Sequence, residues 1–146
     1  MNFMESNTYH IYNRSNEVIF KSHDNYIFFL QKINHLIKPY SDILAWCLMP
    51  NHFHILLMSN KNGCKHLNEQ HRPNVQNLSK NIGSLLSGYT RAFNNQNNRK
   101  GKLFTHNTVA KLLNNQQINN YTILQNCFHY IHQNPIRAGL CRNIED

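Results

Sequence analysis

Three shortages narrow what this chain of 146 residues can be. No apolar run approaches the roughly 18 residues that a membrane-spanning helix needs, and the N-terminus lacks the basic and then apolar stretch of a secretory signal, so we expect a cytoplasmic protein. The four cysteines include no Cys-x-x-Cys pair, which argues against a zinc ribbon or a disulfide framework. Acidic residues are scarce, 7 against 15 Lys and Arg. This excess of positive charge favours a polyanionic partner, and nucleic acid is the first candidate.

Hydrophobic periodicity divides the chain into strands and helices. In chain order the sequence predicts strand 8–13, helix 24–38, strands 43–48 and 52–58, helix 75–97 and strand 102–113. A last helix begins near Gln116 or Asn119. It is expected to end at Asn134, because Pro135 disfavours helical geometry in the residue before it.

The first six elements follow the split βαβ order of a ferredoxin-like α+β fold. We expect an antiparallel sheet with two helices on one face, followed by the C-terminal helix. The length fits a single domain over residues 1–146. Residues 59–74 are polar and lack periodicity, so we expect a mobile surface loop there.

Two histidines flank Phe53 at the start of the predicted strand 52–58. Because side chains alternate along a strand, His52 and His54 point to the same face about 7 Å apart. Such a pair alone is a weak signal, since histidines at this spacing also occur as half-exposed strand residues. The last helix adds Tyr130 and Asn134, which lie four residues apart and share one helical face.

These four residues together suggest metal-assisted attack on a phosphate group. Neutral His52 and His54 and the side-chain oxygen of Asn134 would hold Mg²⁺ or Mn²⁺ and leave positions open for phosphate oxygens. Tyr130 would be the nucleophile, since tyrosine forms covalent intermediates of this kind. Tyr121 is a weaker alternative near the predicted helix start.

Several other residues keep two interpretations. His10 lies on an adjacent predicted strand and could approach the metal or the phosphate, or be a hydrogen-bonded histidine of the sheet. Tyr12 could stack on an unpaired base or pack in the core. Basic side chains could contact phosphates, which adds affinity without sequence information, or be solvated surface charges. These basic residues are Arg14, Arg91, Arg99, Lys100, Lys102 and Arg137.

Five blocks of the sequence resemble the single-tyrosine HUH transposases, especially the bacterial REP-associated tyrosine transposases and related insertion-sequence transposases. The blocks are 9–14 (YHIYNR), 46–57 (WCLMPNHFHILL), 89–94 (YTRAFN), 101–104 (GKLF) and 130–140 (YIHQNPIRAGL). One departure is the THNT sequence that follows the fourth block, where many relatives carry a more basic run.

The resemblance implies a ferredoxin-like catalytic domain that cleaves and rejoins single-stranded DNA, often folded as a hairpin. His52 and His54 match the histidine pair of the family, Tyr130 its nucleophile and Asn134 its polar ligand. In such enzymes the tyrosine is joined to a 5′ phosphate and the other strand end leaves as a free 3′ hydroxyl. A homodimer is possible. The alternatives are a non-catalytic ferredoxin-like nucleic-acid-binding module and a domesticated, inactive relative.

Overall fold

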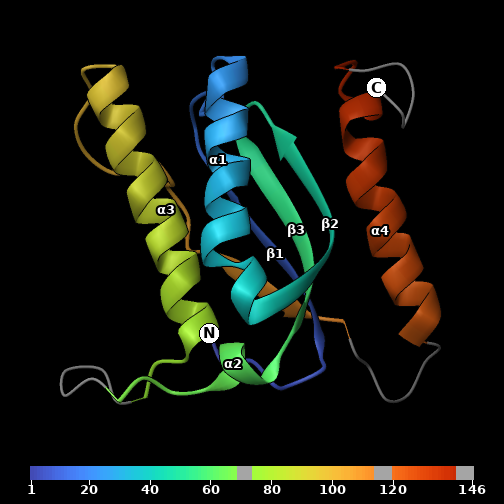
Figure 1. Cartoon of the computed structure of the whole chain (residues 1–146). Coiled ribbons are helices and arrows are strands. Elements are labelled where there is room, and N and C mark those ends of the chain that lie inside the picture. Colours follow the sequence, from blue (N-terminus) through green and yellow to red (C-terminus); the bar gives the residue numbers. More distant parts are fainter. Residues whose placement is uncertain (69–73, 114–119, 141–146) are drawn as a thin grey trace.

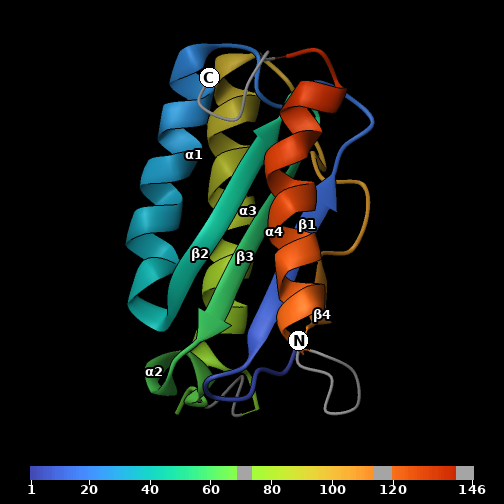
Figure 2. The same cartoon turned by 90° about the vertical axis from the view of Figure 1, so that its right-hand side faces the viewer.

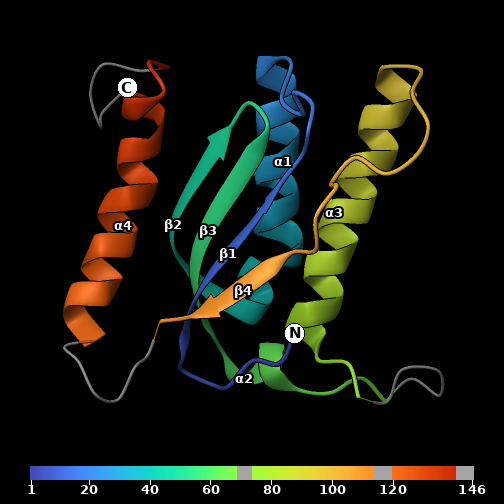
Figure 3. The ribbon, with the colours of Figure 1, turned by 180° about the vertical axis from the view of Figure 1, so that it is seen from behind.

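The computed structural model describes residues 1–68, 74–113 and 120–140. Four strands form one antiparallel sheet in the order β2-β3-β1-β4, so that β1 and β3 are central (Figure 3). The strands are β1 (Thr8–Arg14), β2 (Ser41–Met49), β3 (His52–Ser59) and β4 (Val109–Leu112). The predicted ferredoxin-like fold class is confirmed.

Helices cover both faces of this sheet. On one face lie α1 (His23–Leu36) and α3 (Asn77–Gln96), and on the other lies α4 (Asn120–Arg137) (Figures 1 and 2). The helix α1 begins with a capping box in which the Ser22 side chain accepts a hydrogen bond from the backbone of Asn25, which satisfies a backbone donor that the first turn leaves free.

Alternation along the central strands separates two apolar clusters. The larger one lies between the sheet and α1 and α3, and includes Phe29, Phe53 and Tyr89, all fully buried. The smaller one lies between the sheet and α4, and includes Leu56 of β3 and Ile131 of α4. Neighbouring residues of β3 therefore belong to different layers of the molecule.

Two predicted elements are wrong in extent. The strand predicted over 102–113 is present only as β4, because Gly101 adopts a φ of +91° and side chains of β1 hold the following backbone: Nδ2 of Asn13 donates to the carbonyl of His106. The helix α4 continues through Pro135 to Arg137. A proline this close to the helix end removes one backbone donor, and the chain still forms the bond from Ala138 N to Asn134 O.

Residues 59–74, predicted to be a loop, contain a short helix, α2 (Lys61–Cys64), whose cap Asn60 accepts from the backbone of Gly63. A 3₁₀ turn, η1 (Lys38–Tyr40), precedes β2. Residues 69–73 of the predicted loop lie outside the described part of the chain, as do the predicted helix starts Gln116 and Asn119. Within the described part, no helix is long and apolar enough to cross a membrane.

Candidate active site

Strand β3 presents two imidazoles on the face of the sheet that α4 covers. The ring centroids of His52 and His54 lie 5.1 Å apart with the ring planes at 89°. Phe53 between them points into the large cluster on the other face and is fully buried. His54 is buried and His52 is half-buried. The predicted placement of both histidines on one face is confirmed.

The helix α4 brings Tyr130 to this pair. The Tyr130 ring meets the His54 ring edge-on, with centroids 5.8 Å apart, and remains 45% exposed. Its neighbour Ile131 is fully buried against the sheet and fixes this turn of the helix. One turn further, Nδ2 of Asn134 is buried and has no hydrogen-bond partner. The side chain of the alternative tyrosine, Tyr121, lies outside the described part.

A third imidazole joins the pair from β1. Nε2 of His10 lies 2.9 Å from Nδ1 of His54, and the two rings stack with centroids 5.1 Å apart. The sequence left the position of His10 open, because a contact between neighbouring strands depends on their register. In the structure His10 is a hydrogen-bonded histidine of the sheet, and its partner is His54.

A hydrogen bond fixes the tautomer of His52, whereas the hydrogen bond of His54 leaves two tautomers open. Nδ1 of His52 lies 2.7 Å from Oδ1 of Asn51, and an amide oxygen only accepts, so Nδ1–H donates and Nε2 keeps its lone pair. The bond between His10 and His54 forms in two tautomeric arrangements. In one of them His54 Nδ1–H donates and its Nε2 keeps the lone pair, and this Nε2 is buried without a partner. Metal-ligating histidines are held in this way, through the ring nitrogen that does not bind the metal.

The surroundings keep the three imidazoles neutral at pH 7. Burial, and then the charge of Lys111, lowers the pKa of His10 from 6.5 to about 4. Burial, and then His10 and His52, lowers the pKa of His54 to about 3. Burial and the charge of Arg14 also lower the pKa of His52. The neutral form is the one that can ligate a metal ion.

The donor set fits a divalent cation. Neutral imidazoles suit several divalent metals, and an amide oxygen suits Mg²⁺ and Mn²⁺. His54 and Asn134 each bury a side-chain nitrogen that has no hydrogen-bond partner. Rotating the Asn134 amide by 180° would put its oxygen in the position of this nitrogen. Within the described residues no group of three His, Cys, Asp or Glu side chains could hold a metal ion. A metal held by His52 and His54 would therefore need a ligand of another kind, such as this amide.

A cavity of about 480 Å³ adjoins these residues, and we call it the Tyr130 cavity. Its lining includes Tyr12, His54, Lys111 and Tyr130. Lys111 of β4 pairs in register with His10 of β1 and gives the cavity a positive charge suited to a phosphate group. The sequence analysis missed Lys111 as a site residue, because its position opposite His10 depends on the strand pairing.

The residues predicted to contact phosphates lie in three places. Arg14 pairs in register with His52 and therefore lies beside the histidine pair. Arg137, near the end of α4, is exposed and donates to Gln133. The other four line a second cavity between α3 and residues 99–108, apart from the Tyr130 cavity. They are Arg91, Arg99, Lys100 and Lys102.

Comparison with known proteins finds a solved structure with a similar fold. No family model matches the chain, and no curated protein matches it in sequence. A solved structure of a REP-associated tyrosine transposase bound to a REP hairpin is similar to it, with a TM-score of 0.64 and 13% sequence identity over 99% of this chain and 75% of that chain. The likeness is one of fold. It covers the sheet, the helices on both its faces and thus the elements that carry the histidines and Tyr130.

Proposed function

We propose that this protein is a metal-dependent, single-tyrosine HUH transposase that cleaves and rejoins single-stranded DNA, presented as a hairpin. The observation that carries the proposal is the contact of Tyr130 with His54, whose Nε2 is buried and unpartnered. The net charge of +8 favours a DNA partner, and so does the fold likeness to a transposase bound to a REP hairpin.

Each residue has a separate role in the proposed reaction. His52, His54 and the Asn134 oxygen would hold Mg²⁺ or Mn²⁺, which would polarise the phosphate oxygens and offset the charge that develops on them. Oη of Tyr130 attacks phosphorus, so that the Oη–P bond forms as the P–O3′ bond breaks. The phenol loses its proton and the leaving 3′ oxygen gains one.

The covalent intermediate explains how a strand could be rejoined. The 5′-phosphotyrosine bond replaces the cleaved phosphodiester and conserves much of its energy. The 3′ hydroxyl of another strand can therefore attack the same phosphorus and release Tyr130 without ATP. Arg14, the last residue of β1, and Lys111 of the neighbouring β4 would hold the flanking phosphates by charge.

A covalent-adduct assay tests the proposal. The protein is incubated with a hairpin oligonucleotide and Mn²⁺ and run on a denaturing gel. We expect an adduct with the wild type and with the control Tyr40→Phe, which removes a phenol on η1, and no adduct with Tyr130→Phe. Adducts that persist in Tyr130→Phe would overturn the assignment of the nucleophile, and full adduct formation in EDTA would overturn the metal requirement.

The same experiment separates the alternative of a non-catalytic binding module. Such a module retards the hairpin on a native gel and forms no denaturant-resistant band. Mixing Tyr130→Phe with His54→Ala tests whether two copies share a site, because adducts would reappear only if Tyr130 of one copy serves the histidines of another.

A further inference from the structure

Three cavities of the described residues adjoin one another around the edge of the sheet. The first is the Tyr130 cavity. The second, of about 480 Å³, is lined by Tyr12, Asn13, His106 and Asn107 among others, and we call it the edge cavity. The third, of about 750 Å³, lies between α3 and residues 99–108, and we call it the basic pocket. Tyr12 lines the first two cavities, and Asn13, His106 and Asn107 line the last two.

The edge cavity lies where the short strand β4 ends. The pairing of β4 with β1 ends at Tyr12 opposite Val109, so Asn13 and Arg14 have no strand beside them on this side (Figure 3). Alternation along β1 directs Tyr12 toward the face of α4 and Asn13 toward the face of α3. The two residues therefore stand on opposite sides of the open edge.

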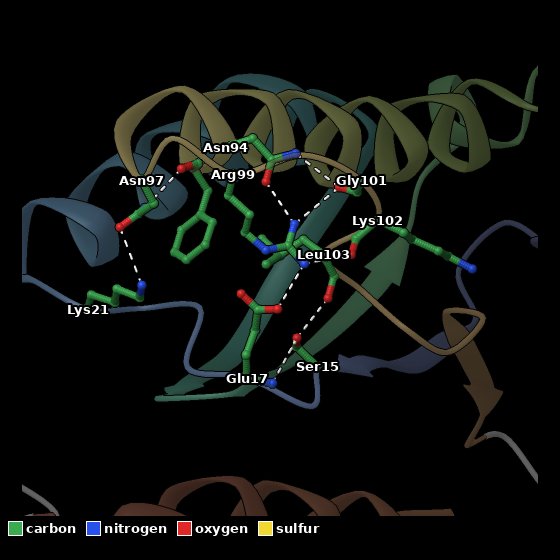
Figure 4. Close-up of polar contacts among 10 residues, drawn as sticks. Ser15, Glu17, Lys21, Asn94, Asn97, Arg99, Gly101, Lys102 and Leu103 are labelled. Atoms are coloured by element: carbon green, nitrogen blue, oxygen red, sulfur yellow. Dashed lines mark hydrogen bonds and ion pairs between the residues drawn. The ribbon is translucent and has the colours of Figure 1, made fainter.

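Hydrogen bonds hold the wall of the basic pocket in place. The Arg99 guanidinium donates to Oδ1 of Asn94, to the carbonyls of Gly101 and Lys102, and to Glu17, with which it forms an ion pair at 2.8 Å (Figure 4). The loop is also tied to β1, because Nδ2 of Asn13 donates to the carbonyl of His106 and to Oγ1 of Thr108. The pocket is therefore formed before any ligand arrives.

The charges along the three cavities all have one sign. Arg99 is neutralised by Glu17, but Lys100 and Lys102 are exposed, and Figure 4 shows the Lys102 side chain directed away from the Arg99 network. None of the described residues that line the three cavities is Asp or Glu. The cations are Lys111 in the Tyr130 cavity, Arg14 in the edge cavity, and Arg91, Arg99, Lys100 and Lys102 in the basic pocket.

We propose that the three cavities form one track for single-stranded DNA, which leads from Tyr130 around the open edge of the sheet to Lys100 and Lys102. A positively charged groove with an aromatic side chain such as Tyr12 is the usual means of binding an unpaired strand. The track rests on the proposed function for its substrate. It adds that the strand flanking the cleaved phosphate is held on the opposite face of the sheet from the histidines.

Binding measurements on hairpins with different single-stranded tails test the track. The probes are fluorescein-labelled hairpins with a short or a long tail, and the proteins carry Tyr130→Phe so that no adduct forms. We expect the long tail to raise affinity in this background. The double variant Lys100→Ala/Lys102→Ala should lose that gain and bind the short-tailed hairpin unchanged. Its slope of log K against log salt should fall by about 1.4, at about 0.7 per phosphate contact on a single strand.

The control removes equal charge elsewhere. Lys61→Ala/Lys65→Ala changes two exposed lysines of the α2 region that line none of the three cavities, so it should keep the gain from the long tail. The track is overturned if Lys100→Ala/Lys102→Ala keeps either this gain or the salt slope of the Tyr130→Phe parent, or if both double variants lose them equally. Failure of the proposed function is distinguishable, because it appears as absent adducts with Tyr130 intact, whatever the tail-dependent binding shows.

Discussion

His10→Phe should weaken metal binding without removing any proposed ligand. Phenylalanine keeps an aromatic ring against Tyr12 and His54. It has no nitrogen to pair with Nδ1 of His54, which lies 2.9 Å from the lost Nε2 and which donates in the tautomer that leaves Nε2 of His54 free for a metal. Loss of such a supporting hydrogen bond costs about 10- to 100-fold in metal affinity, or roughly 1.4 to 2.7 kcal/mol. Nδ1 of His54 is also left buried and unpaired, which should lower the free energy of unfolding by about 1 to 3 kcal/mol.

Calorimetric titration with Mn²⁺ measures the affinity, and urea unfolding of the metal-free protein measures the stability. His10→Gln is the informative control, because its amide oxygen can accept from Nδ1–H and should restore part of the affinity. His35→Phe removes an exposed imidazole at the end of α1 and should change neither quantity. Wild-type Mn²⁺ affinity in His10→Phe would refute the supporting role. So would a ¹⁵N NMR spectrum showing that Nε2 of His54, rather than Nδ1, carries the proton.

Three further predictions concern stability. Replacing Arg99 by Ala removes the four hydrogen bonds of its guanidinium. Because the network is partly exposed, the free energy of unfolding should fall by about 2 kcal/mol and the melting temperature by roughly 6 °C. An unchanged melting temperature would contradict this. The pKa values of His10 and His54, lowered to about 4 and about 3, mean that only the unfolded chain takes up protons just below pH 6.5. Stability from this pair should therefore be full above pH 6.5 and fall as the pH drops toward 4, and equal urea midpoints at pH 7 and pH 5 would contradict it. Tyr89→Phe removes the donor to the buried carbonyl of Ile19 and should cost about 1 to 3 kcal/mol, whereas a urea midpoint within error of the wild type would contradict that bond.

The sequence predicted the features that depend on local periodicity. Alternation around Phe53 is enough to place His52 and His54 on one face, and helical spacing is enough to place Asn134 one turn after Tyr130. Apolar residues at the correct period also predicted β1, β2, β3, α1 and α3 to within a few residues at each end. These features require only the geometry of one element at a time.

Features that depend on contacts between elements could not be predicted from the sequence. The residues after Gly101 include Leu103 and Phe104, whose apolar side chains resemble a strand in sequence, although both are buried in irregular backbone tied to β1. The bond between His10 and His54 depends on the register of β1 against β3. Local patterns carry no information about either, because the partners lie 44 and more residues apart.

The alternation of β3 between two layers links the chemistry of this protein to its folding. Phe53 lies in the large core, and His52 and His54 lie at the candidate site. The register of β3 therefore determines both the packing of the core and the position of the two imidazoles. Deleting one residue from the strand would turn the histidines into the core and Phe53 toward α4. Variation that preserves the core of β3 therefore preserves the orientation of its imidazoles, and a copy that had lost its activity could retain the shape of the site for as long as it still folds.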